Sequence, residues 1–233
     1  VSLSGAASLQ ADGGGDDDLV VVSRGNVTVT GGDIEIGGGS GNDTVAASSG
    51  GPVTLSGASV TIDGGANDDL VLLSDSAVTV TSGDITLSGG TGNDTIRLTS
   101  STALISAGVG ISYLGGRGSD FITGTDFGES FDGGSGIDII LAGGGDDDAS
   151  GGANPDAIDG GAGNDTLSGE GGEDLLLGGA NDDVLYGGDD DDVLIGADGT
   201  DAYFGGDGVD TVQFFGTSRS EEHTSELQSR ETI

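Results

Sequence analysis

A nine-residue repeat constrains this chain more than any other feature. From Gly115 to Gln213 the sequence divides into eleven consecutive units of nine residues, and the register never slips. The sixth position of every unit is acidic, the eighth is always apolar, and the first is Gly in every unit except the one that begins at Ala142. Such a strict short period predicts a solenoid, in which each unit packs chiefly against its neighbours.

The acidic residues of the sixth position are the candidate ligands of this region. They are Asp120, Glu129, Asp138, Asp147, Asp156, Asp165, Asp174, Asp183, Asp192, Asp201 and Asp210. We expect the six Gly-rich residues of each unit to form a tight turn, and the last three to form a strand with one inward apolar side chain. Two units then close one flattened coil of 18 residues. Acidic residues 18 apart should therefore line up along the two edges of the solenoid.

The same signature recurs upstream at wider intervals. The segments GGGDDDLV, GGSGNDTV, GGANDDLV and GGTGNDTI begin at residues 13, 38, 64 and 89, and 26 more residues reach Gly115. Each interval holds three short runs with alternating apolar residues, such as LVVVS, NVTVT and DIEI. This pattern predicts four coils of three strands with one acidic corner each, at Asp18, Asp43, Asp69 and Asp94. These corners either bind ions as the repeat acids do or form solvated turns, and both readings stay open.

The charge of the chain excludes several classes of partner. There are 41 acidic residues against 5 basic ones, all of them Arg, which gives a formal net charge of -36. No basic surface is available for nucleic acid or anionic lipid, and no apolar run reaches the ~20 residues of a membrane span. Cys is absent, so disulfides and thiolate metal sites are excluded. The expected partners are cations.

The aligned acidic residues require such cations. Unit charges about 4.8 Å apart repel by roughly 0.9 kcal/mol in bulk water and by several-fold more at a protein surface. Carboxylates combined with turn carbonyls, without His or Cys, form a set of oxygen ligands that suits Ca²⁺. Mg²⁺ fits less well, because it demands strict octahedral geometry and gives up its waters reluctantly.

The unit Gly-Gly-x-Gly-x-Asp-x-U-x, where U is apolar, resembles the calcium-binding nonapeptide of RTX (haemolysin-type) repeat proteins. The resemblance covers residues 115 to 213. It implies a parallel β-roll whose sixth-position acids and turn carbonyls bind several Ca²⁺ ions. It also implies a bacterial protein that is secreted to the cell surface or beyond by type I machinery, through a C-terminal signal that this sequence lacks. Glu129 departs by one methylene, so we expect weak or no binding between it and Asp147.

The last residues differ in composition from the repeats. Residues 219–233 contain no Gly and no Asp, and RSEEHTSELQS (219–229) looks like the translation of a short-read sequencing adapter. We therefore expect residues 216–233 to be a non-native tail. The remaining chain is predicted to be an all-β solenoid with two parts: a β-helix with three strands per coil over residues 1–114, and an RTX β-roll over residues 115–215.

These features predict a calcium-binding, calcium-triggered folding module of a secreted protein, adhesin-like and without catalytic activity. The alternative is a non-catalytic or partial region of an extracellular polysaccharide-acting enzyme, or of an RTX protease or lipase. A polysaccharide-acting β-helix should present basic or aromatic groups among paired acids. Residues 1–114 contain Arg24 and Arg97, no Lys or His, and neither His-Glu-x-x-His nor Gly-x-Ser-x-Gly. The sequence therefore favours the binding module.

Overall fold

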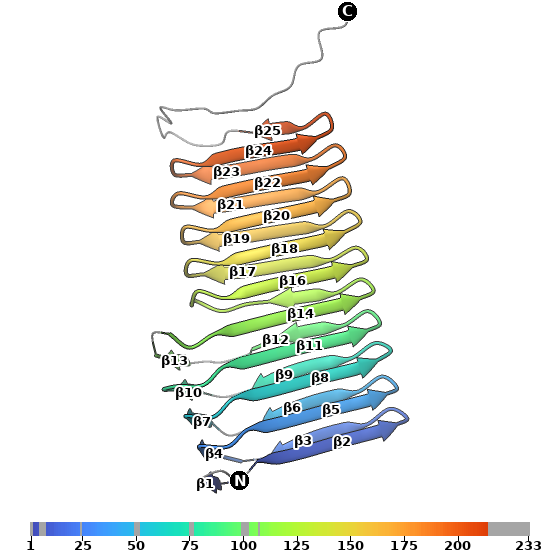
Figure 1. Ribbon diagram of the computed structural model, residues 1–233, viewed down its shortest axis with the longest axis vertical. Coiled ribbons are helices and arrows are strands. Elements are labelled where there is room, and N and C mark those ends of the chain that lie inside the picture. Colours follow the sequence, from blue (N-terminus) through green and yellow to red (C-terminus); the bar gives the residue numbers. More distant parts are fainter. Residues whose placement is uncertain are drawn as a thin grey trace, which may run out of the picture.

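The computed structural model shows a parallel β-solenoid whose coils stack along one long axis (Figure 1). It describes residues 2–4, 8–23, 25–48, 52–74, 77–98, 103–106 and 108–213. The strands belong to three sheets, and neighbours within a sheet are always one coil apart in sequence and parallel. The all-β solenoid predicted from the repeat is thereby confirmed.

The sheets differ in length. Sheet A has five strands: β1 (Ser2–Ser4), β4 (Val27–Thr30), β7 (Val53–Ser56), β10 (Val78–Val80) and β13 (Ala103–Ile105). Sheet B has ten: β2 (Leu9–Gly15), β5 (Ile34–Ser40), β8 (Val60–Ala66), β11 (Ile85–Thr91), β14 (Ile111–Arg117), β16 (Ser130–Ser135), β18 (Asp148–Ala153), β20 (Thr166–Gly171), β22 (Val184–Asp189) and β24 (Ala202–Asp207). Sheet C also has ten: β3 (Leu19–Ser23), β6 (Thr44–Ser48), β9 (Leu70–Ser74), β12 (Thr95–Arg97), β15 (Phe121–Thr123), β17 (Ile139–Gly144), β19 (Ala157–Ala162), β21 (Leu175–Ala180), β23 (Val193–Asp198) and β25 (Thr211–Gln213).

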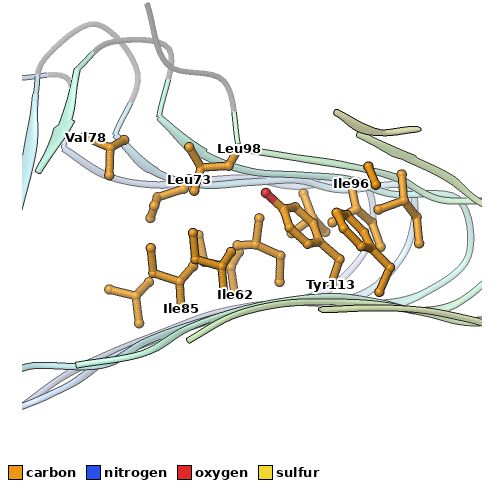
Figure 2. Close-up of a cluster of buried hydrophobic side chains, with 14 of the residues drawn as sticks. Ile62, Leu73, Val78, Ile85, Ile96, Leu98 and Tyr113 are labelled. Carbon is orange, nitrogen blue, oxygen red and sulfur yellow. The ribbon is translucent and has the colours of Figure 1, made fainter. Parts of the chain in front are cut away.

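The first coils have three sides, one from each sheet. The alternating residues expected to share one face are buried, as Val27 and Val29 on β4 and Ile34 and Ile36 on β5 show. Because side chains alternate across a strand, the same strands turn Thr28 and Glu35 outward. Figure 2 shows the inward residues of successive coils, among them Ile62, Leu73 and Ile85, stacked in rows.

After β13 the coils lose their third side and become flattened, with sheets B and C facing each other (Figure 1). The eighth-position residues form the core between these sheets, and those from Ile122 to Leu194 are buried. Tyr203 and Val212, in the last described coil, are only partly buried. The 18-residue coil predicted from the repeat is confirmed by the pairing of Ile140 with Ile158 and of Ile158 with Leu176.

The prediction of three-residue strands was wrong. Most strands of the flattened coils contain six residues, as β19 and β20 do, because each continues through the first three positions of the next unit. The turn is then confined to positions four to six. Gly at position one allows this extension. It lies in the extended strand and faces the rung carboxylate, and a larger side chain would collide with that carboxylate.

The change in coil shape is accompanied by an aromatic stack. Tyr113 on β14 pairs in register with Leu87, which itself pairs with Ile62, so Tyr113 continues a core row as its place in the sequence indicates. Its ring stacks on Phe131 of the next coil, with ring centroids 4.8 Å apart and planes 9° from parallel. Both rings are buried (Figure 2 labels Tyr113). Larger side chains fill the core where sheet A ends.

The predicted tail lies outside the described residues. Residues 214–233 are not described, so the adapter-like tail stays a prediction. Across the parts of the chain that are described, no helix exists that could span a membrane.

Core packing predicts the effect of shortening one inward side chain. Ile158 is fully buried in the middle of the flattened coils. Ile158→Ala should lower the free energy of unfolding in saturating calcium by about 2–5 kcal/mol, measured by urea denaturation followed by circular dichroism. Thr166→Ala, on the exposed outer face of sheet B, should change stability by less than about 0.5 kcal/mol. Equal effects of the two substitutions would contradict the assigned core.

Candidate calcium-binding ladders

Ten aspartates form a continuous row along the corner that joins sheet B to sheet C, here called the long ladder. In each coil the backbone N–H of the aspartate donates to Oδ1 of the aspartate one coil further on, at 2.7–3.1 Å. Its members are Asp18, Asp43, Asp69, Asp94, Asp120, Asp138, Asp156, Asp174, Asp192 and Asp210.

The long ladder runs without a break through the change in coil shape. Asp94 N–H donates to Asp120 Oδ1 at 2.7 Å, although the two residues are 26 apart and the following pair is 18 apart. From the sequence alone, the upstream corners can either bind ions or form solvated turns. The structure places them in the same row, with the same hydrogen bond and, for Asp43, Asp69 and Asp94, the same burial.

A second row, the short ladder, lies on the opposite edge, where sheet C passes to sheet B. It begins only after sheet A has ended, because sheet A occupies that side of the earlier coils. Glu129 N–H donates to Asp147 Oδ1, and the same bond at 2.8–3.1 Å continues to the end of the row. Its members are Glu129, Asp147, Asp165, Asp183 and Asp201. The two edges predicted from the 18-residue spacing are therefore present.

The second carboxylate oxygen of most rungs is buried and has no partner. Oδ2 has no hydrogen-bond partner among the described residues in Asp43, Asp69, Asp94, Asp120, Asp138, Asp147, Asp156, Asp165, Asp174, Asp183 and Asp192. A buried polar atom without a partner costs about 1–3 kcal/mol, and more when it carries charge. A row of such atoms, one per coil, is the structural feature that most requires a bound cation.

The glycines of the repeat bring main-chain atoms close to these oxygens. A methyl group built on Gly151 would come within 2.5 Å of Asp156 Oδ2, and the same contact recurs at the first position of the other units. Positions two and four mostly have positive φ, as at Gly116 (106°) and Gly118 (118°), which favours Gly. The carbonyl oxygens of Gly116 and Gly118 then lie against Gly134 and Gly136 of the next coil. Turn carbonyls of positions two and four therefore lie between successive coils on the edges that carry the rungs.

Burial raises the pKa of these carboxyl groups. Desolvation is the largest cause, the backbone N–H of the preceding rung partly offsets it, and neighbouring carboxylates in most cases add to it. The pKa rises to about 6 in Asp69, Asp120, Asp174 and Asp192, to about 7 in Asp94, Asp156 and Asp183, and to about 8 in Asp147. It is also raised in Asp138 and Asp165.

Glu129 is the one buried rung whose oxygens both have partners. Its Oε2 accepts from Thr125 N–H at 2.7 Å, and its Oε1 accepts from the Thr125 hydroxyl at 2.7 Å and from the Tyr113 hydroxyl at 3.1 Å. Protein donors thus satisfy the carboxylate from the side that lacks a preceding coil. The extra methylene noted in the sequence brings the carboxylate to these donors, which sequence reasoning did not find.

The carboxylates alone do not make a chelating cluster. No group of three or more His, Cys, Asp or Glu side chains suited to a metal occurs within the described part of the chain. Each gap between coils instead offers one carboxylate from either side, together with turn carbonyls. Oxygen-only ligation of this kind fits Ca²⁺, which accepts six to eight oxygens in flexible geometry.

Fold and ladders together define a parallel β-solenoid built to hold divalent cations along its corners. A family model of the RTX calcium-binding nonapeptide repeat (4 copies) matches residues 12–33, 81–98, 123–157, 150–185 and 177–212, together more than half of the chain. The chain belongs to this family and binds Ca²⁺ through its repeats. Two of the matches lie in the three-sided coils, upstream of the uninterrupted nonapeptides. The search of curated proteins finds no match.

The raised pKa values predict how the metal-free chain responds to pH. Asp147 has a pKa of about 8 when folded, against 3.8 as its ordinary value, so the folded carboxyl keeps a proton that the unfolded chain has released. The resulting stability is fully present below about pH 4 and is lost as the pH rises to about 8. In excess chelator, the β signal in circular dichroism should therefore be stronger at about pH 5 than at about pH 8.

A neutral substitution provides the control for that measurement. Asp156→Asn removes one titrating rung and should raise the β signal of the chelated chain at about pH 8, whereas Asp148→Asn on the exposed outer face should not. A β signal that is independent of pH in chelator would argue against buried, protonated rungs.

Proposed function

We propose that each gap between successive rungs of the two ladders, except the gap between Glu129 and Asp147, binds one Ca²⁺ ion, and that this binding triggers folding of the chain. The observation that carries the proposal is the row of buried Oδ2 atoms without a hydrogen-bond partner among the described residues. The proposed ligands are the rung carboxylates and the turn carbonyls of positions two and four. The rungs of the three-sided coils, Asp18, Asp43, Asp69 and Asp94, are included, because they share the hydrogen-bonded row.

Binding should be weakest at the start of the short ladder. Glu129 already has three donors on its carboxylate, so a cation there would have to displace them. Ala142 is fully buried and places a methyl group at position one of the unit that contains Asp147, where other units have Gly beside the carboxylate. Asp147, in that unit, has the highest raised pKa among the rungs. We propose that the gap between Glu129 and Asp147 stays without metal.

Ion binding can trigger folding because the sites exist only when coils are stacked. Neighbouring rungs approach to about the strand spacing of 4.8 Å, where unneutralised charges repel. An ion that binds only the folded state raises the free energy of unfolding by about 2.7 kcal/mol per site when its free concentration is a hundred times the dissociation constant. The stacked rungs supply such sites repeatedly, and each coil is stabilised by its neighbours.

The wider role follows from the repeat family. RTX repeat proteins are typically secreted, and we propose that this chain is an extracellular or cell-surface module, exported by type I machinery and adhesin-like in its parent protein. We propose a structural, non-catalytic role, divided between the three-sided coils (1–114) and the flattened roll (115–215). The family match supports this role, because it covers calcium-binding repeats and no catalytic domain.

A calcium titration tests the trigger. Adding Ca²⁺ to the chelated chain near neutral pH should convert a weak β spectrum into a strong one in a cooperative transition, and Mg²⁺ should be much less effective. The measurement is far-ultraviolet circular dichroism with calorimetry for the number of ions. A strong β spectrum that stays unchanged in excess chelator would contradict the proposal.

Substitutions along the ladders test the site assignment. Asp174 adjoins two gaps, toward Asp156 and Asp192, so Asp174→Ala should remove up to about 5 kcal/mol of calcium-dependent stability. Asp210 is the last described rung, and Asp210→Ala should cost about half as much. Glu173→Gln, next to Asp174 but outside the ladder, is the matched control.

A substitution of Glu129 distinguishes discrete calcium sites from a diffuse attraction of counter-ions. Glu129→Gln should leave the number of bound ions unchanged, because that gap is proposed to hold none, whereas Asp165→Asn should reduce it. Equal losses from both substitutions, measured by titration calorimetry, would show that the acids attract calcium without forming discrete sites.

A further inference from the structure

In the middle of the flattened coils, the outer face of sheet C is more apolar than the outer face of sheet B. Phe121, Ile139, Leu141 and Leu175 point outward from sheet C and are 37–44% exposed. The outward residues of β16 and β18 in sheet B are Ser130, Asp132, Asp148 and Ser150. Sheet B has its own exposed large apolar residues only on other strands, at Leu114, Tyr186 and Phe204.

Two opposite charges interrupt this apolar face. Arg97 on β12 and Asp159 on β19 belong to one outward column, in which Arg97 pairs with Thr123, Thr123 with Leu141, and Leu141 with Asp159. They lie three strand spacings apart, about 14 Å, so they do not pair within one chain. Arg97 is one of only five basic residues in the sequence.

Each charged group has a buried or half-buried part without a partner in the described structure. The Arg97 guanidinium Nε is buried and has no hydrogen-bond partner there, and Leu72 beside it is only 5% exposed. No side chain in the described ranges donates to the Asp159 carboxylate, and burial raises its pKa. An opposite charge from outside the chain would stabilise the ionised form of Asp159 and give Arg97 a partner.

The two charges lie on strands that are separated by two others. The order of the described strands of sheet C is β25-β23-β21-β19-β17-β15-β12-β9-β6-β3, so the midpoint between Asp159 on β19 and Arg97 on β12 falls between β17 and β15. A two-fold axis parallel to the strands and through this midpoint exchanges the two positions.

We propose that two copies of this chain associate through the outer faces of sheet C, with their long axes antiparallel. In this isologous dimer Arg97 pairs with Asp159 of the partner subunit, and Asp159 pairs with Arg97 of the partner subunit. The same axis places Phe121 opposite Ile139 of the partner subunit and Leu70 opposite Leu175 of the partner subunit. The two charged pairs and these apolar pairs are thus complementary across the proposed interface.

The dimer should be weak and should depend on calcium. The face covers on the order of 500 Å² per copy from its length and width, below the roughly 800 Å² per partner of a standard interface. Each chain also carries a net charge of -36, which must be largely neutralised before two copies can approach. The dimer therefore rests on the proposed calcium binding and should form at high chain concentration.

A charge swap tests the proposal. In millimolar calcium, sedimentation velocity of the full chain should show a concentration-dependent dimer that disappears in chelator. Arg97→Asp and Asp159→Arg should each weaken dimerisation by about tenfold or more, because like charges then face each other. The double variant, Arg97→Asp with Asp159→Arg, should restore it. Asp132→Arg, at the same repeat position on the outer face of sheet B, should have no effect.

The outcomes separate this proposal from the proposed function. Circular dichroism of each variant with calcium establishes that it folds. A chain that folds with calcium but stays monomeric at every concentration would overturn the dimer and leave the calcium-binding function intact. Two other results would overturn the assigned face. One is that both single variants still dimerise as the unchanged chain does, and the other is that the double variant does not dimerise.

Discussion

The structure depends on one repeated interaction, the hydrogen bond from the backbone N–H of one buried aspartate to Oδ1 of the next. It aligns the rungs at the coil spacing of the parallel strands and holds each carboxylate at the corner. It also leaves Oδ2 buried without a partner among the described residues. The bond that aligns the rungs thereby creates a row of desolvated negative charge. Protons, at the raised pKa values, or calcium ions can neutralise it.

Glu129 shows what a rung looks like when the protein itself supplies the donors. Thr125 and Tyr113 satisfy its carboxylate at the point where the short ladder has no preceding coil. The stacked rings of Tyr113 and Phe131 fill the core at the same place. The transition from three-sided to flattened coils is therefore stabilised by ordinary packing and hydrogen bonds. The buried aspartate rungs have no such donor on Oδ2 among the described residues.

The inward and outward positions of the flattened coils differ in how uniform their residues are. Position eight points inward in every unit and is apolar throughout, whereas positions seven and nine point outward and differ between alternate units. The apolar residues of sheet C, with Arg97 and Asp159 in one outward column, form the face through which we propose that a second copy binds. Calcium would then serve both folding and association, since it neutralises the charge that opposes each.

The sequence by itself determined the period, the inward residues and the two edges of carboxylates, because a strict nine-residue repeat leaves few ways to stack. It also indicated that Glu129 would differ. Only the tertiary structure joined Asp94 to Asp120 in one row, since that depends on how coils of 26 and 18 residues share a corner. The strand length, the Thr125 and Tyr113 donors and the position of Arg97 relative to Asp159 likewise depend on which backbone atoms and side chains meet across coils. A repeat specifies each coil, but the contacts between unlike coils arise only when they are stacked.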